Sequence, residues 1–267
     1  MTTDAYGNEK ETDAGSRAET PARNAIVTGG SRGIGREIVR RLAANGYRVV
    51  FTYEKEEDAA RGLERELRAS GRDVFAERCR LTDIGEPDDM LERASRHFGS
   101  GPEPFLDVLV NNAGVIDHAD IRHTTPEAYD RVMNVNAKGT FFMMQRGEVR
   151  MRDGGRIVNI SSVGTAWPSP GEAVYAASKA AVEQFGRVAS REFGRRGITV
   201  NTISPGPTDT DMLRSGVREE DLAGLRHLTA LGRLGTPADI ADVVLLLVDP
   251  RAGWVTGQNI RVDGGLV

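Results

Sequence analysis

The stretch TGGSRGIG, residues 28–35, follows a short apolar run at residues 25–27 and opens an amphipathic stretch that contains Ile34, Ile38 and Leu42. This order predicts a strand, a tight turn and a helix. Glycines allow the backbone of the turn to approach a pyrophosphate, and the helix N-terminus offers unpaired N–H groups and partial positive charge to that anion. The stretch therefore predicts a nucleotide-binding turn, with a glycine-rich structural turn as the alternative.

Short β-rich runs alternate with longer helical patterns along the rest of the chain. The runs that we expect to form strands are residues 25–27, 48–52, 73–76, 105–110, 156–160, 199–203 and 259–262. Gly46 and Gly71 follow helical patterns as C-terminal caps do, and Pro87 and Pro126 suit the first turns of new helices. Seven strands with helical crossovers predict an α/β fold, a Rossmann-like, doubly wound parallel sheet with helices on both faces.

Composition and charge bound the domain organisation and the partners. Residues 1–22 are polar, which predicts a flexible N-terminal tail, and residues 23–267 show no central linker and are expected to form a single domain. The net charge of −4 argues against a nucleic-acid partner. The longest apolar run, residues 243–248, is too short to span a membrane, and no signal segment opens the chain, so we expect a cytoplasmic protein. His227 shares no ligand spacing with the other histidines, so we expect no catalytic metal.

A tyrosine and a lysine lie four residues apart in the helical pattern AVYAASKAAVEQF. This spacing places Tyr175 and Lys179 at neighbouring positions of one helix face. Because a nearby ammonium lowers the pKa of a phenol, Lys179 is expected to tune Tyr175 for proton transfer to or from a substrate oxygen. A chance pairing on a helix is the alternative. The residues expected to form the buried stripe of this helix are Ala177, Ala181, Phe185 and Val188.

Polar residues near the strand ends extend this site. Ligands of such sheets bind at the carboxyl ends of the strands, which selects residues 29–35, 111–114, 161–162 and 205–210. Ser162 is placed to hydrogen-bond the oxygen that Tyr175 protonates, and Asn136 to hold a water that links Lys179 to solvent. A strand-end turn for Ser162 and a backbone-satisfied buried amide for Asn136 are the alternatives.

These segments, in this order and spacing, resemble the short-chain dehydrogenase/reductase family over residues 23–267. The matching segments are TGGSRGIG, NNAG at residues 111–114, the tetrad Asn136, Ser162, Tyr175 and Lys179, PGPTDTDM from residue 205, and GQNIRVDGG from residue 257. The resemblance implies an NAD(P)(H)-dependent oxidoreductase that transfers hydride between nicotinamide C4 and a carbonyl or secondary alcohol, with Tyr175 as acid/base. It also implies that Ser162 orients the substrate oxygen, that Lys179 binds the nicotinamide ribose and that Asn136 completes a proton relay.

The resemblance further implies a set of cofactor-binding residues, among which Thr210 would contact the carboxamide. The set is Gly29, Ser31, Arg32, Gly33, Ile34, Gly35, Tyr53, Leu81, Asn112, Ala113, Gly114, Tyr175, Lys179, Pro205, Gly206, Thr208 and Thr210. NADP(H) is favoured over NAD(H), because Arg32 resembles the arginine of NADP-preferring relatives and Tyr53 replaces the aspartate of NAD-preferring ones. Glu54 reaching the ribose would reverse this preference.

One position departs from the family pattern. CRLTD, residues 79–83, puts Arg80 where relatives carry an aspartate that accepts from the adenine amino group. Three interpretations stay open: Asp83 replaces that carboxylate, Arg80 stacks on the adenine, or Arg80 points to solvent.

The substrate is bounded only by class. The pattern is similar to 3-oxoacyl-thioester reductases and to sugar or polyol dehydrogenases, so we favour an NADPH-dependent ketoreductase, with an alcohol dehydrogenase or a non-catalytic cofactor-binding sensor as alternatives. Arg196 matches a basic position of carrier-protein reductases, but Asp153 occupies the second such position, so a thioester-linked substrate stays open. Residues 163–174 and a lid-like segment, residues 207–234, are expected to select the substrate. The resemblance implies a homotetramer or a homodimer.

Overall fold

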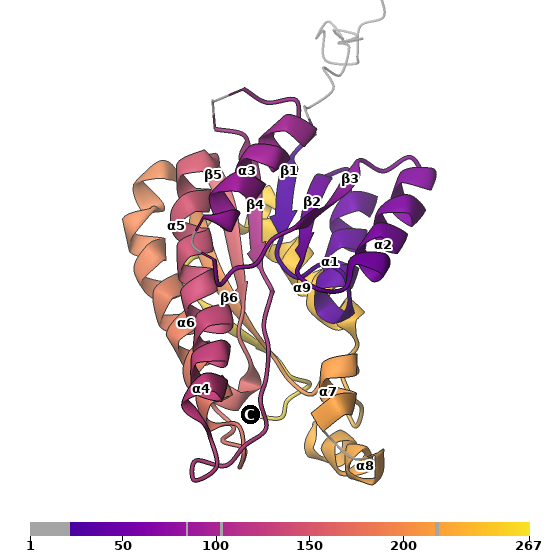
Figure 1. Cartoon of the computed structure of the whole chain (residues 1–267), viewed down its shortest axis with the longest axis vertical. Coiled ribbons are helices and arrows are strands. Elements are labelled where there is room, and N and C mark those ends of the chain that lie inside the picture. Colours follow the sequence, from indigo (N-terminus) through magenta and orange to yellow (C-terminus); the bar gives the residue numbers. More distant parts are fainter. Residues whose placement is uncertain (1–21, 84, 102–103, 217–218) are drawn as a thin grey trace, which may run out of the picture.

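The computed structural model of the protein describes residues 22–83, 85–101, 104–216 and 219–267 (Figure 1). The expected tail lies outside the described residues except for its last position. The described residues form one α/β domain in which a central sheet is covered by helices on both faces.

Within the described residues, the sheet has seven strands, all parallel, in the order β3-β2-β1-β4-β5-β6-β7. The strands are β1 (Asn24–Val27), β2 (Arg48–Tyr53), β3 (Val74–Arg78), β4 (Leu106–Asn111), β5 (Met151–Ile160), β6 (Thr199–Pro205) and β7 (Asn259–Val262). After β3 the chain crosses back to place β4 beside β1. The strand order reverses there, so a ligand site is expected at the carboxyl ends of β1 and β4. The doubly wound Rossmann-like fold predicted from the sequence is confirmed.

Two apolar clusters hold the helical layers to the sheet. One face is covered by α1 (Gly33–Ala44), α2 (Glu57–Ala69) and α9 (Pro237–Val248), whose buried residues include Leu42, Leu63 and Val244. The other face is covered by α3 (Glu86–His97), α5 (Thr140–Arg150) and α6 (Ala173–Glu192). Strands buried on both faces explain why the sequence shows short continuous apolar runs rather than alternation.

The remaining helices lie around the carboxyl end of the sheet. Helix α4 (Pro126–Met133) runs through a π-helical turn, η1 (Asn134–Gly139), directly into α5. The segment after β6 forms α7 (Asp211–Gly216) and α8 (Glu219–Leu228), which lie apart from the two helical layers at the lower end of Figure 1. This segment is helical as expected, although residues 217–218 lie outside the described part.

The local signals for helix ends are confirmed. Gly46 and Gly71 follow α1 and α2 with φ of 80° and 77°. Pro87 lies in the first turn of α3, and Pro126 begins α4. These residues set the helix boundaries because a left-handed glycine ends a helix and proline needs no N–H partner in the first turn.

The expected strand bounds are close to the observed ones except in β5. This strand begins at Met151 instead of residue 156, and Leu106 pairs with Met151 before a register shift that leads to the pairing of Val108 with Arg156. The shift accommodates the glycine pair after Asp153. An irregular, exposed strand start of this kind carries little apolar signal.

The expected buried stripe of α6 is wrong. Val188 is 45% exposed, Ala177 is exposed and Phe185 is only partly buried. The residues that α6 buries are Ser178, Lys179, Val182, Glu183, Gly186, Ala189 and Ser190. The helix therefore turns a largely polar face to the sheet, and its more apolar face lies at the surface.

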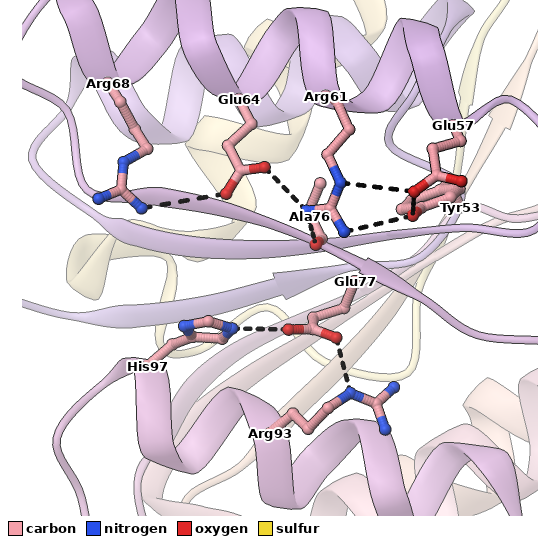
Figure 2. Close-up of polar contacts among 9 residues, drawn as sticks. All are labelled: Tyr53, Glu57, Arg61, Glu64, Arg68, Ala76, Glu77, Arg93 and His97. Carbon is pink, nitrogen blue, oxygen red and sulfur yellow. Dashed lines mark hydrogen bonds and ion pairs between the residues drawn. The ribbon is translucent and has the colours of Figure 1, made fainter.

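Strand β3 forms one edge of the sheet, and arginines cover its outer side (Figure 2). Arg61 of α2 donates to the Ala76 carbonyl oxygen at 2.8 Å, and Arg93 of α3 donates to the Arg78 carbonyl oxygen at 3.0 Å. Glu77 lies between these two positions and accepts from Arg93 and from His97 at 2.6 Å each. Its pKa is lowered, because these partners outweigh the effect of burial.

Candidate active site

The glycine turn passes very close to the loop after β4. Gly29 has φ of 67°, and a Cβ added there would lie 2.8 Å from the Ala113 Cα. A Cβ at Gly35 would lie 2.2 Å from the Gly29 carbonyl oxygen and 2.4 Å from the Asn112 Nδ2. Neither position accepts a side chain without movement of the backbone, so glycine is required at both.

The side chains of Thr28, directly after β1, and of Asn112 in the NNAG segment hold this turn in place. The Thr28 hydroxyl accepts from the backbone N–H groups of Asn112 and Ala113 at 3.0 and 3.1 Å. The Asn112 amide donates to the carbonyl oxygens of Thr28 and Gly29 at 3.0 and 2.9 Å. Asn112 therefore acts on the backbone of the turn, and Thr28 is a further site residue that the sequence reasoning did not select.

The turn delivers the N-terminus of α1 to the site. Among the described residues, no side chain caps this terminus and its first turn contains no acidic residue. Ser31 is buried beside it, and Ile34 anchors the turn to the core. A helix start with free N–H groups and a glycine cradle that a Cβ would fill together fit a pyrophosphate.

The end of β2 differs from its expected role. The Tyr53 side chain is buried, and its hydroxyl donates to Glu57 at 2.9 Å while Arg61 contacts the same oxygen (Figure 2). Burial raises the pKa of Tyr53, so this phenol stays neutral. The expectation that Tyr53 binds the cofactor therefore has no support from its hydroxyl, which is turned toward α2. Arg32 and Glu54 are both exposed, and Arg32 has no side-chain partner in the described part of the chain.

Arg80 is held by α3. Its backbone N–H and its Nε donate to the two carboxylate oxygens of Glu86 at 2.6 and 2.5 Å, and its guanidinium lies 3.5 Å from Asp83. This pairing lowers the pKa of Glu86. The three interpretations of Arg80 omitted this ion pair, which occupies Arg80 and draws in Asp83. Leu81 beside it is buried against Gly139 of η1.

The loop after β6 closes the other side of the turn. A Cβ at Gly33 would lie 3.5 Å from the Thr210 Cγ2, so the glycine turn and this loop face each other. The Thr210 hydroxyl accepts from the Leu213 N–H at 3.3 Å and so caps α7. Pro205 ends β6, Gly206 packs on Asp263, and Thr208 is buried with its hydroxyl donating to the Gly206 carbonyl. The structure thus brings this predicted group together with residues 29–35.

Lys179 lies under the carboxyl end of β5. It is 4% exposed, and its Nζ donates to the Ile160 carbonyl oxygen at 2.8 Å. The same Nζ lies 5.8 Å from the centre of the Tyr175 ring and would be 3.2 Å from a Cβ at Gly114. Burial lowers the pKa of Lys179 to about 8. The predicted proximity of the two side chains is confirmed.

Tyr175 shows the opposite pKa shift from the one expected. Burial raises its pKa to about 12, a hydrogen bond with Ser162 acts in the other direction, and the nearby Glu172 adds to the rise. Desolvation of the phenolate therefore outweighs any stabilisation by Lys179. The Ser162 hydroxyl also accepts from the Gly164 N–H at 3.1 Å, so the strand-end turn and the contact with Tyr175 coexist.

Asn136 sits in the π-helical turn η1 and is fully buried. Its amide accepts from the Val115 N–H at 2.8 Å and donates to the Val115 carbonyl at 2.8 Å and to Ser178 at 3.0 Å. Its Oδ1 would also lie 3.4 Å from a Cβ at Gly114, beside the Lys179 amine. Asn136 therefore fastens the loop after β4 to α6, as the alternative interpretation of a satisfied buried amide expected.

Glu183 is a supporting residue that the sequence reasoning missed. It is buried one turn after Lys179, and its Oε1 accepts from Ser161, Thr165 and Ser204 at 2.8, 2.6 and 3.3 Å. Ser161 and Thr165 flank Ser162 in the chain, so this carboxylate fixes the segment that carries the serine. The only sign of Glu183 in the sequence is a glutamate within the helical pattern. A glutamate at an exposed helix position would look the same in the sequence.

Among the described residues, no group of three or more His, Cys, Asp or Glu side chains is arranged to hold a metal ion. No helix among those residues is both long enough and apolar enough to cross a membrane.

Comparison with known proteins identifies the fold and the family. A family model described as enoyl-(acyl carrier protein) reductase matches residues 29–267. The 3-oxoacyl-[acyl-carrier-protein] reductase FabG of Staphylococcus aureus is 38% identical over 91% of this chain and 98% of its own length. The hydroxynaphthalene reductase-like protein Arp2 of Metarhizium brunneum is 38% identical over 94% of this chain and 99% of its own length.

Solved structures agree with the sequence relatives. The angucycline C-6 ketoreductase LanV with bound NADP is 40% identical and superposes with a TM-score of 0.85 over 91% of this chain and 95% of that chain. A short-chain dehydrogenase/reductase from Serratia marcescens is 38% identical, with a TM-score of 0.85 over 91% of this chain and 97% of that chain. This chain shares these similarities and also has the glycine turn, the buried Lys179 and the strand order described above. The chain therefore belongs to the short-chain dehydrogenase/reductase family of NAD(P)-dependent oxidoreductases.

Proposed function

We propose that the protein is an NADPH-dependent ketoreductase in which Tyr175 protonates the carbonyl oxygen of the substrate. The observation that carries this proposal is the position of Tyr175, whose phenol is hydrogen-bonded to Ser162 and whose ring centre lies 5.8 Å from the buried Lys179 amine, with the pKa of Tyr175 raised to about 12. With that pKa the phenol holds its proton at neutral pH, which is the form that a carbonyl reduction needs. Relatives described as reductases and ketoreductases support the same direction.

Each residue of the site has a separate role in the proposed reaction. The Ser162 hydroxyl orients the substrate oxygen toward the Tyr175 hydroxyl, and the Lys179 ammonium stabilises negative charge that develops at this point. Asn136 holds the loop around Gly114 against Lys179. The nicotinamide cofactor, when bound, supplies the hydride that reaches the carbonyl carbon. Glycine-turn N–H groups would hold its pyrophosphate.

The direct test of this function is a substrate panel. Initial rates of NADPH oxidation would be measured with free ketones and an acetoacetyl thioester, and rates of NADP reduction with sugars and polyols. Turnover of ketones supports the proposal, and turnover of sugars or polyols alone would assign the alternative, an alcohol dehydrogenase. A substrate linked to a carrier protein has less support. Arg196, the basic residue expected to face the carrier, is paired with Glu148 and Asp153 at 2.6 and 2.8 Å.

Ketone reduction is expected to slow as the pH rises through about 8, because the Lys179 ammonium loses its proton there. A required protonated group gives a tenfold fall in rate per pH unit above its pKa. The measurement is the initial rate of NADPH oxidation from pH 6 to pH 10. Deprotonation of Lys179 does not itself destabilise the fold, since a folded pKa below the unfolded value of 10.5 makes this group's contribution to stability increase between pH 8 and pH 10.5. A flat profile up to pH 10 would contradict the assignment.

Phosphate preference is proposed to reside in Arg32. Its exposed guanidinium at the N-cap of α1 has no partner within the described residues, so it is available for a 2′-phosphate. Arg32→Ala is expected to weaken NADPH binding about tenfold and to leave NADH binding unchanged. Fluorescence titration of both cofactors measures this, with Arg191→Ala, an exposed arginine of α6, as the control. Unchanged NADPH/NADH selectivity in Arg32→Ala would refute the assignment.

We also propose assembly into a homotetramer. The α5/α6 surface exposes Phe141 and Val188 at 42% and 45%, and Phe141 packs on Phe185 with ring centres 5.2 Å apart. A second surface near the end of the chain exposes Leu246 at 66% and Trp254 at 98%. Exposed apolar surfaces of this kind mark interfaces, and two of them build a tetramer where one builds a dimer. The mass in solution, measured by light scattering, distinguishes the two.

A further inference from the structure

Glu172 lies immediately before α6, three residues ahead of Tyr175. Its side chain is 25% exposed, and its carboxylate accepts no hydrogen bond from any described residue. The His118 imidazole lies beside it, but its Nδ1 is 3.9 Å from the Glu172 Oε1, which is beyond hydrogen-bond distance. The proposed mechanism does not use this carboxylate.

The carboxylate faces the same small space as the catalytic serine. A Cβ added at Gly164 would lie 3.4 Å from the Ser162 Oγ and 3.7 Å from the Glu172 Oε2. The Ala119 N–H donates to the Gly171 carbonyl at 3.0 Å, which holds the loop with His118 against the segment before α6. Electrostatic contact with Tyr175 is also direct, because Glu172 raises the pKa of that phenol. Glu172 thus borders the point where the substrate oxygen is activated.

The far side of this space is formed by α7. A Cβ at Gly216 would lie 2.2 Å from the His118 Nε2, so the last residue of α7 packs directly on the imidazole. His118 therefore connects Glu172 to the segment that follows β6. The carboxylate, the imidazole and α7 lie together beside Ser162 and Tyr175. Glu172 and α7 belong to the two segments expected to select the substrate, and His118 lies between them.

A carboxylate in this position is costly unless a donor reaches it. Burial raises the pKa of Glu172, and His118 only partly opposes this shift. A carboxylate that is 25% exposed keeps only part of its hydration, and no described residue replaces the lost part with a hydrogen bond. Sites that present such an acceptor discriminate strongly in favour of ligands that carry the matching hydroxyl.

We propose that Glu172 accepts a hydrogen bond from a substrate hydroxyl near the reacting carbonyl, so that the preferred substrates are hydroxy ketones. The proposal rests on the proposed ketoreductase function and names its substrate class. An unsubstituted acyl chain leaves the carboxylate unpaired, which disfavours simple fatty 3-oxoacyl substrates. Glu172 is a specificity residue and does not take part in the proton transfer from Tyr175.

The first test compares 2-hydroxyacetophenone with propiophenone, which carries a methyl group in place of the hydroxyl. The wild-type protein is expected to favour the hydroxy ketone by at least about tenfold in kcat/KM. Glu172→Leu removes the acceptor and should bring this ratio close to one, while Glu172→Gln keeps an amide acceptor and should retain part of it. Glu192→Leu, at the exposed end of α6, is the matched control and should keep the wild-type ratio. A wild-type ratio near one, or an unchanged ratio in Glu172→Leu, overturns the proposal.

A binding measurement separates this inference from the catalytic function. Calorimetry with NADPH-saturated protein would compare 1-phenyl-1,2-ethanediol with 1-phenyl-1-propanol, which again differ by one hydroxyl. Tighter binding of the diol that is lost in Glu172→Leu supports the role of Glu172 even if no ketone is turned over, in which case the ketoreductase function alone fails. Equal binding of both alcohols by the wild-type protein overturns the role of Glu172, whatever the turnover.

Discussion

Tyr175→Phe is expected to lower ketone reduction by roughly 10²- to 10⁴-fold, because it removes the proton that must reach the carbonyl oxygen. The substitution deletes one hydroxyl and keeps the ring that packs above Lys179. Cofactor binding should stay within about twofold of the wild type, since the glycine turn and the α1 N-terminus are untouched. Stopped-flow measurement of NADPH oxidation, with a fluorescence titration of NADPH, gives both quantities.

Tyr129→Phe is the matched control for this experiment. Tyr129 lies on α4 and is 48% exposed, so loss of its hydroxyl should leave both rate and affinity unchanged. Turnover by Tyr175→Phe at the wild-type rate would show that another group supplies the proton. A fall in rate with a parallel loss of NADPH binding would indicate a structural role for Tyr175 instead.

Gly35→Ala is expected to have the largest effect on the cofactor site. The new Cβ would lie 2.2 Å from the Gly29 carbonyl oxygen and 2.4 Å from the Asn112 Nδ2, so the turn and the hydrogen bonds of Asn112 must shift. Overpacking of this kind costs about 1–3 kcal/mol of the free energy of unfolding. Because the anion-binding N–H groups of α1 move with the turn, NADPH affinity should fall by roughly tenfold or more. Urea denaturation and NADPH titration measure the two effects.

Gly62→Ala provides the control for a glycine substitution as such. Gly62 lies inside α2, and a Cβ there has no neighbour within 4 Å. Alanine should therefore stabilise the protein by about 0.5–1 kcal/mol through the lower entropy of its unfolded backbone, with no change in NADPH affinity. If Gly35→Ala behaved like Gly62→Ala, the glycine turn would not be the close-packed cradle described above.

The sequence predicted the fold and the proximity of Tyr175 and Lys179 well because both rest on short-range patterns. Residues 28–35 carry strand, turn and helix signals in one stretch, and Tyr175 and Lys179 are placed on one helix face by their spacing alone. The parallel arrangement of the sheet also followed, because strands that alternate with helical crossovers leave few arrangements. These predictions required no knowledge of which distant residues meet.

The buried face of α6 could not be predicted in this way, because hydrophobic periodicity assigns apolar residues to the core. The catalytic face of α6 is buried but polar, with Ser178, Lys179 and Glu183 turned inward. Their burial is possible because hydrogen bonds from Asn136, Ser161 and others reach them across 15 or more residues of chain. A hydrophobicity pattern does not show which distant residues will supply these hydrogen bonds.

Two other side chains make contacts that were not predicted, for a related reason. Tyr53 occupies the expected position at the end of β2, but its hydroxyl is bound by Glu57 and Arg61 of the following helix. Arg80 was expected at the adenine or in solvent, and it is bound by Glu86 while its side chain remains 48% exposed. In both cases the hydroxyl or guanidinium group binds an oppositely charged or polar side chain that lies within ten residues along the chain. Position along a strand predicts where a Cα lies, whereas local competition decides where the side chain points.

The arginines on the outer side of β3 protect the sheet from joining another chain. An edge strand normally presents free carbonyl oxygens to which a foreign strand can add. Here the Arg61 and Arg93 guanidinium groups donate to the outward carbonyls of Ala76 and Arg78, where the N–H groups of such a strand would bind. A strand from another copy of the protein therefore cannot pair with this edge, which prevents amyloid-like stacking along it. The proposed tetramer would then have to form through other surfaces, and a symmetric assembly of that kind closes instead of growing into fibres.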